Sequence, residues 1–250
     1  LNCLFTYFFA YCVFLSPLVI AHRGYSAVYP ENTLLAIRAA VDSGAEGVEI
    51  DIHRTKDGQL ILQHDETLDR MTTGRGKVEE HPWHGYIDGL KTRGSESAEP
   101  VALLSQVFDF CMSPAVPIGF ILVLDVKDDQ NLSVLDELAD LLEKYPKYSE
   151  KLVVYLGVWR EDFAQHFRMQ NKTNSVRLTL IAENCSPTIV NSSLYDAFNL
   201  NVDLITEEVV KIANSLDKNV LLWTCNSPEQ IAMAKKLSVQ GILTDDPLSI

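Results

Sequence analysis

Two histidines and several carboxylates stand at or beside the ends of apolar runs in the segment 18–65. Glu49 and Asp51 are two residues apart in one strand-like run, so their side chains point to the same side. Two like charges held together there repel each other unless a positive charge lies between them, and a divalent cation with oxygen ligands supplies that charge. His22 and His64, placed on either side of a phosphate bound to the cation, would serve as general acid and general base.

More polar side chains follow other apolar runs. Asp125 and Lys127 close the run that begins at Phe120, and Trp223 ends another run. Active-site residues of barrels with alternating strands and helices collect at the carboxyl ends of the strands, whereas residues needed only for stability have no reason to do so. We therefore predict a metal site made of Glu49, Asp51 and Asp125, with Mg²⁺ or Ca²⁺ favoured over zinc because all the ligands are oxygens.

The remaining pattern predicts the scaffold for these residues. A helix is expected over Asn32–Ser43 with Asn32 as its N-cap, and the Asp57-Gly58 turn predicts an antiparallel return through Leu60 to His64. Alternating strands and helices follow as far as Thr244, which favours a parallel sheet and, at this length, a (β/α)₈ TIM barrel. Nine strand-like runs are one too many for such a barrel, and the run Val202–Ile205 is the least secure of them.

Length and composition narrow the function. The 250 residues, 47% of them hydrophobic, suffice for one large domain, here residues 17–250 with an irregular insertion at about 66–100. A net charge of −13 argues against nucleic-acid binding and gives no general attraction to an anionic membrane. The five cysteines are scattered without a CxxC pair and predict neither a zinc site nor a disulfide framework.

Several short motifs together resemble the glycerophosphodiester phosphodiesterase (GDPD) family. They are HRG at 22–24, PENT at 30–33, EID at 49–51, TKDG at 55–58, HD at 64–65, LDVK at 124–127, LLWTCN at 221–226 and GILTDDP at 241–247. The resemblance implies a metal-dependent phosphodiesterase on a TIM barrel with the family's insertion. In that family a neighbouring glycerol hydroxyl attacks phosphorus, and water then opens the cyclic phosphate.

The resemblance also implies individual roles. His22 and His64 are the acid–base pair, in an order that the sequence leaves open. Arg23 and Lys127 hold the phosphate, Arg23 through its fork and Lys127 as a point charge, and Trp223 is expected at the substrate. Glu31 of the PENT motif positions His22 or the metal; a role only in starting the helix is the alternative. The family usually has Glu at the position of Asp125, which leaves the identity of the metal open.

The substrate expected first is a membrane lipid. Asp125, the LGVW run at 156–159 and the last two motifs resemble the fungal phosphatidylglycerol-specific phospholipase C branch, whose products are diacylglycerol and glycerol 3-phosphate. The alternatives are a soluble glycerophosphodiesterase acting on deacylated headgroups and a lysophospholipase D. A phosphatidylinositol-type phospholipase and a catalytically inactive interaction module fit the motifs poorly.

The first sixteen residues carry no charge and are strongly apolar. A membrane anchor or an uncleaved signal-like segment is expected, because the strand that leads to His22 leaves no room for a cleavage site. A misplaced start and a plug for the bottom of the barrel are the alternatives. The anchor predicts a membrane-associated protein, for example on a lipid droplet, a mitochondrion or the endoplasmic reticulum.

Overall fold

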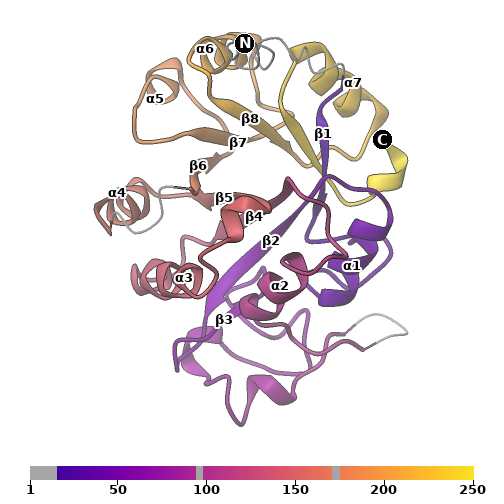
Figure 1. The fold of residues 1–250 in the computed structure, drawn as a ribbon, viewed down its shortest axis with the longest axis vertical. Helices are drawn as coiled ribbons and strands as arrows, with labels where there is room; N and C mark the ends of the chain where they lie inside the picture. The colour runs from indigo at the N-terminus through magenta and orange to yellow at the C-terminus, as the bar shows by residue number, and fades with distance from the viewer. Residues whose placement is uncertain (1–15, 94–97, 171–174) are drawn as a thin grey trace, which may run out of the picture.

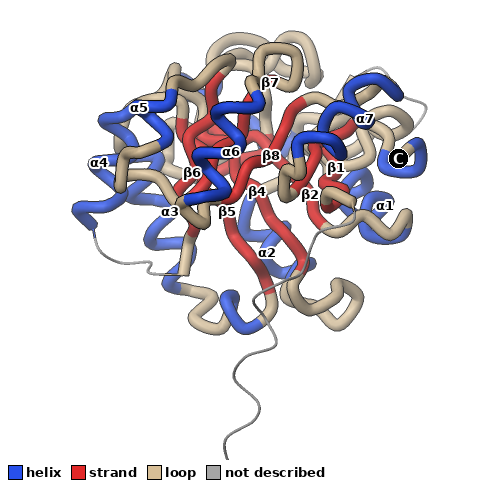
Figure 2. Tube along the Cα trace, turned by 90° about the horizontal axis from the view of Figure 1, so that it is seen from above, coloured by secondary structure: helices blue, strands red, loops and turns tan. Residues whose placement is uncertain are grey.

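The computed structural model describes residues 16–93, 98–170 and 175–250. Within this part of the chain, eight parallel strands pair in the order β1-β9-β8-β7-β6-β5-β4-β2, and the ring closes by pairing of β2 with β1. Helices surround the ring of strands (Figures 1 and 2), which confirms the predicted (β/α)₈ barrel. A ninth strand, β3, lies outside the ring and is antiparallel to β2, as the tight turn between them predicts.

The barrel strands are β1 (Leu18–His22), β2 (Gly47–Arg54), β4 (Phe120–Val126), β5 (Leu152–Val158), β6 (Arg177–Ala182), β7 (Ala197–Asn201), β8 (Asn219–Trp223) and β9 (Gly241–Thr244). The extra strand β3 spans Leu60–Leu62. The helices are α1 (Leu34–Asp42), α2 (Leu104–Cys111), α3 (Ser133–Glu143), α4 (Glu161–Gln170), α5 (Pro187–Val190), α6 (Glu207–Ser215) and α7 (Pro228–Leu237). Single 3₁₀ turns are η1 (Val78–Glu80), η2 (Ile87–Gly89), η3 (Tyr148–Glu150) and η4 (Pro247–Ser249).

The alternation of side chains along the strands divides the core into two parts. One set of alternate strand residues packs with the helices, for example Val48, Ile50 and Leu122. The other set fills the barrel interior, for example Ile20 and Val123. Along β1 and β4 the interior set ends in His22 and Asp125, so the period of two carries polar side chains to the carboxyl rim.

Helix α1 starts one residue later than predicted. Thr33, not Asn32, is its N-cap: the Thr33 hydroxyl accepts a hydrogen bond from the backbone N–H of Ala36. Asn32 has a positive φ of 57° and is buried. Its side chain is engaged with Asp51, so tertiary structure overrides its local capping preference.

The strand predicted at Val202–Ile205 is wrong. The strand is β7 at Ala197–Asn201, and the chain turns at Val202. In β7 the interior-facing positions include the polar Asn199, which made this strand look less apolar than the segment after it. The surplus strand in the sequence-based count is β3, which pairs beside the barrel.

Of the segment predicted as an insertion, residues 66–100, the structure describes 66–93 and 98–100. These residues follow β3 as loops and two 3₁₀ turns, most of them at the foot of Figure 1. Ile61, Leu68, Val78, Ile87 and Val101 form a small buried core of their own beneath these loops. Ile61 and Leu103 also pair in an isolated antiparallel bridge, so the two ends of the excursion lie together. The described part of the insertion is thus a compact layer on the barrel.

The expected N-terminal anchor, residues 1–16, falls almost wholly outside the described residues. Within the part of the chain that the structure describes, no helix is both long and apolar enough to cross a bilayer.

Gly47 faces the barrel interior opposite Ile121, and a Cβ at this position would lie 2.6 Å from Cβ and 2.8 Å from the carbonyl oxygen of Ile121. We expect Gly47→Ala to lower the free energy of unfolding by about 1–3 kcal/mol, because overpacking forces side chains and backbone to shift. Urea unfolding measures this. Gly89→Ala is the matched control: nothing lies within 4 Å of its Cβ, and it should change stability by less than about 0.5 kcal/mol. Equal stabilities of both variants would contradict this account of the interior packing.

Candidate active site

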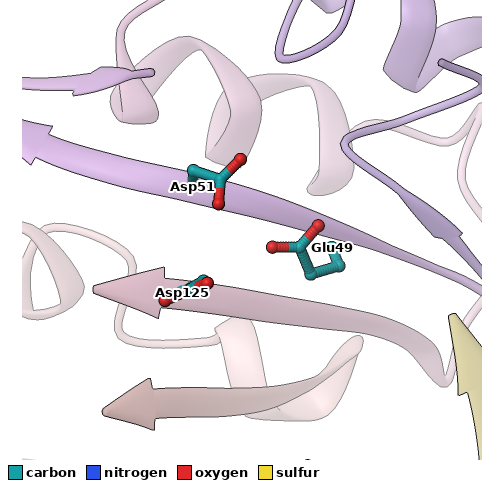
Figure 3. A group of neighbouring side chains, drawn as sticks. All are labelled: Glu49, Asp51 and Asp125. Carbon is teal, nitrogen blue, oxygen red and sulfur yellow. The ribbon is translucent and has the colours of Figure 1, made fainter. Parts of the chain in front are cut away.

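Three carboxylates meet at the carboxyl rim of the barrel (Figure 3). Glu49 and Asp51 extend from β2, and Asp125 extends from the neighbouring β4, where it pairs in register with Asp51. One ligand oxygen from each lies within 4.8 Å of the others. All three residues are at least 94% buried, so their charges are poorly screened by water.

Burial and crowding shift the pKa values of these groups. Burial, reinforced by the charge of Asp51, raises the pKa of Glu49, and burial also raises the pKa of Asp125. Burial opposes the charged form of Asp51 too, but Lys127 and Arg23 outweigh it and lower its pKa. The rim therefore holds excess negative charge that favours binding of a cation.

Lys127 supplies part of the balancing charge. Its Nζ lies 2.6 Å from Asp51 Oδ1 and 2.6 Å from Asp125 Oδ2. Only the contact with Asp125 has hydrogen-bond geometry. The buried Asp51 Oδ1 is paired with the ammonium by charge. The sequence predicted that Lys127 holds a phosphate. In the structure Lys127 also forms ion pairs with two of the carboxylates.

The donor set fits a hard divalent cation. It consists of carboxylate oxygens alone, and the buried Asp51 Oδ1 is balanced by the charge of Lys127. Neighbouring groups fix the remaining oxygens: Asn32 Nδ2 donates to Asp51 Oδ2 at 2.7 Å, and Trp159 Nε1 donates to Asp125 Oδ1 at 2.9 Å. Such partners orient ligands before the ion arrives. Glu49, Asp51 and Asp125 could therefore hold a metal ion.

His22 is held by an aspartate from the far end of the chain. Its Nδ1 lies 2.6 Å from Asp245 Oδ1, and Arg23 Nε donates to its Nε2 at 3.3 Å. This places the proton on Nδ1 and directs the lone pair of Nε2 to the N–H of Arg23, with Glu49 Oε2 3.9 Å from the same nitrogen. Burial lowers the pKa of His22, but the hydrogen bond to Asp245 and the charge of Glu49 outweigh it and raise the pKa above its ordinary value.

His64 has a similar partner. Its Nδ1 lies 2.8 Å from Oδ1 of the adjacent Asp65. The guanidinium of Arg70 binds Asp65 in turn and holds the pKa of that carboxyl at about 2. The return of the chain through β3 places His64 at the rim, since the backbone N–H of Gln63 donates to the carbonyl oxygen of Asp51.

Arg23 contacts the carboxylates of the site through both its backbone N–H and its side chain. Its φ of 57° is left-handed, and in this conformation its N–H donates to Glu49 Oε2 at 2.9 Å. Its guanidinium contacts Glu31 at 3.1 Å and Asp51 at 3.4 Å. Gly24, at φ 81°, packs so closely on Ala36 that a Cβ there would lie 2.7 Å away, which accounts for the glycine of the HRG motif.

Two cavities meet at this centre. One, of about 230 Å³, is lined by His22, Arg23, Glu49, His64, Asp125, Lys127, Trp159, Ile181, Glu183, Asn199, Trp223 and Leu243. The other, of about 550 Å³, is lined by His22, Arg23, Ser26, Ala27, Glu31, Asn226, Asp245, Asp246 and Ser249. Both cavities therefore open onto His22 and Arg23, from two sides of the rim.

The structure brings together all the residues singled out in the sequence. His22, Arg23, Glu49, His64, Asp125, Lys127 and Trp223 line the smaller cavity, Glu31 lines the larger one, and Asp51 lies buried behind the first. Sequence reasoning missed Asn32, Arg70, Trp159 and Asp245 as their partners. The sequence did offer a clue for two of them, because Asp245 directly follows the last strand and Trp159 directly follows β5, so both lie at the rim.

The barrel, the two histidines and the acidic rim define the class: a hydrolase of the (β/α)₈-barrel type with its polar centre at the carboxyl ends of the strands.

Comparisons with known proteins give the family. Residues 22–249 match the model of the glycerophosphoryl diester phosphodiesterase family, so the chain belongs to that family and is a phosphoric diester hydrolase. It is 29% identical over 249 residues to a glycerophosphodiester phosphodiesterase of Caldanaerobacter subterraneus subsp. tengcongensis, covering 92% of this chain and 94% of the relative.

Solved structures confirm the fold. A glycerophosphodiester phosphodiesterase from Agrobacterium tumefaciens superposes with a TM-score of 0.72 at 21% identity, over 93% of this chain and 97% of the other. A phosphodiesterase from Oleispira antarctica, solved with the product sn-glycerol-3-phosphate, superposes with a TM-score of 0.77 at 18% identity, over 94% and 95%.

Removing one acidic ligand should weaken metal binding. Loss of groups that merely orient metal ligands reduces affinity about 10–100-fold, so we expect Glu49→Gln to weaken binding of Mg²⁺ or Ca²⁺ at least about tenfold. Isothermal titration calorimetry measures this. Glu79→Gln, an exposed carboxylate of η1, is the control and should bind as the unaltered protein does. Undiminished affinity in Glu49→Gln would remove Glu49 from the metal site.

Proposed function

We propose that this chain hydrolyses glycerophosphodiesters that have lost their acyl chains, releasing glycerol 3-phosphate and an alcohol. The observation that carries the proposal is the meeting of two cavities at His22 and Arg23. A phosphodiester has two arms, and this arrangement gives each arm its own space with the phosphorus beside the acidic rim. The names of the relatives support the same activity.

The two histidines would move the protons. Each has its Nδ1 bonded to a carboxylate, His22 to Asp245 and His64 to Asp65, so Nε2 is the atom of each ring that would transfer protons. Arg23 Nε, which donates to Nε2 of His22 in this structure, would turn to the phosphate when substrate binds. One imidazole takes the proton of the attacking hydroxyl, and the other gives a proton to the departing alkoxide. The carboxylates stabilise whichever imidazole is protonated, so the ring positions change little during the reaction.

The phosphate would be held by positive groups at the same place. Arg23 contributes a fixed guanidinium and Lys127 an ammonium, and both already lie among the carboxylates. A divalent cation held by Glu49, Asp51 and Asp125, Mg²⁺ or Ca²⁺ by ligand chemistry, would add charge stabilisation at the phosphoryl oxygens. Together these groups oppose the negative charge that develops on the phosphate.

The lining of the larger cavity favours a deacylated substrate over phosphatidylglycerol. Except for Ala27, every side chain around the larger cavity is polar or charged, and acyl chains gain nothing from such a surface. The two tryptophans that line the smaller cavity are held in place by hydrogen bonds within the site. Trp159 donates to Asp125, and Trp223 donates to the carbonyl oxygen of Asn199 at 3.1 Å, with the two rings in edge contact.

Phosphatidylglycerol cleavage is the second candidate, supported by the motifs of the fungal branch and by the apolar first sixteen residues. It carries with it the proposal of a membrane-associated protein. Both candidates use the same rim and differ in which molecules reach it.

Product analysis tests the proposal. With Mg²⁺ or Ca²⁺ present, we expect glycerol 3-phosphate from glycerophosphocholine and glycerophosphoglycerol, and no diacylglycerol from phosphatidylglycerol in mixed micelles. Excess chelator should abolish activity. Diacylglycerol formation would establish the second candidate instead, and full activity in chelator would exclude the metal.

Replacing either histidine should impair the chemistry without unfolding the chain. Because positioned proton transfer contributes about 10²–10⁴-fold, His22→Ala and His64→Ala should each lower kcat at least about 10²-fold. Steady-state kinetics on the better diester measures the loss. The exposed His84 of the insertion is the matched control, and His84→Ala should leave kcat unchanged. A kcat close to normal in both rim variants would end the acid–base assignment.

A further inference from the structure

Arg70 of the insertion makes an unusually complete set of contacts for a half-exposed side chain. Its Nε and Nη2 donate to Asp65 Oδ2 and Oδ1 at 2.6 and 2.8 Å. Its Nη1 and Nη2 donate to Glu31 Oε2 and Oε1 at 3.2 and 2.8 Å. One planar guanidinium thus grips two carboxylates, each through both oxygens, a geometry that a lysine cannot reproduce.

Both carboxylates lead to the rim. Asp65 Oδ1 also accepts from Nδ1 of His64, and Glu31 Oε1 also accepts from Arg23 at 3.1 Å. None of these four hydrogen bonds of Arg70 goes to His64 or Arg23 directly. It holds their partners, one on the loop after β1 and one after β3, which are distant in the sequence.

We propose that Arg70 is a positioning residue that fixes His64, through Asp65, with its proton on Nδ1 and its Nε2 free for chemistry. Glu31 anchors the guanidinium from the opposite side, so Asp65 cannot swing away with His64. The importance of His64 rests on the proposed function, but its tautomer does not.

The ion pairs of Arg70 should contribute little to the stability of the fold, so its effect on His64 can be measured in a folded variant. Exposed ion pairs contribute little stability, and the side chain of Arg70 is 47% exposed. Without Arg70, in contrast, Asp65 loses the group that holds its carboxylate in place, and once that acceptor moves, the imidazole of His64 can place its proton on either nitrogen and rotate. Loss of Arg70 should therefore affect the ring of His64 far more than the fold.

Long-range ¹H–¹⁵N NMR of the histidine rings tests this without requiring activity. In the full chain we expect His64 as the Nδ1–H tautomer, assigned by comparison with His64→Ala. In Arg70→Met we expect exchange between tautomers with unchanged thermal unfolding. Arg75→Met, an exposed arginine of the same insertion, is the control and should leave the His64 signals unchanged. An unaltered His64 tautomer in Arg70→Met would overturn the proposal, whatever the substrate proves to be.

Kinetics gives the second readout. Groups that orient reactive side chains contribute about 10–100-fold, so kcat of Arg70→Met should fall by that factor. Arg70→Lys should recover little, because a single ammonium cannot hold both carboxylates, and Asp65→Asn should reproduce the loss. In His64→Ala the added Arg70→Met change should cause no further loss of kcat. A full second loss would show that Arg70 acts elsewhere and would overturn the proposal; an inactive unaltered protein would instead count against the proposed function, with the NMR result standing.

Discussion

The site depends on the repulsion among three buried carboxylates. Glu49, Asp51 and Asp125 are forced together because adjacent parallel strands end at the same rim and place alternate side chains on the same side. Such charges can stay buried only beside compensating cations. Lys127 and Arg23 provide some of that compensation, and a divalent ion held by the three carboxylates would complete it. The cations that balance these carboxylates are also the groups that a phosphodiester needs.

Around this centre, residues of a second kind hold the reactive ones in place. Asp245 and Asp65 fix the two histidines through Nδ1, and Asn32 and Trp159 fix two of the carboxylates. These partners come from loops after different strands. Closure of the barrel therefore assembles the site, because β1 pairs with both β9 and β2 and so brings the last strand beside the first.

Much of the scaffold could be predicted because local patterns encode it. Apolar periodicity located the helices and most strands, and the EID and LDVK motifs located the three carboxylates that meet at the rim. The strand β7 was missed because Asn199 and Asn201 interrupt its apolar character: Asn199 lines the smaller cavity, and Asn201 donates to Glu183 of the same cavity. Asn32 was predicted as the N-cap of α1 because its side chain is of a type that caps helices well. In the structure that side chain donates to Asp51, which is distant in the sequence.

Partners across long sequence separations could not be predicted from such patterns. His22 and Asp245 are 223 positions apart, and Arg70 and Glu31 are 39 apart. Nothing in the local sequence of either member indicates the other. Only the strand order of the closed barrel brings them together, so the orienting half of the site becomes visible only in three dimensions.

The small separate core under the insertion has a consequence for diversification. Ile61, Leu68, Val78, Ile87 and Val101 pack with one another, and the segment leaves and rejoins the barrel at the Ile61–Leu103 bridge. Because His64 and Arg70 lie between these two ends, a unit exchanged between homologous barrels has to carry both residues with it. Within that limit, the loops over the separate core can change in length and sequence while the barrel strands stay as they are.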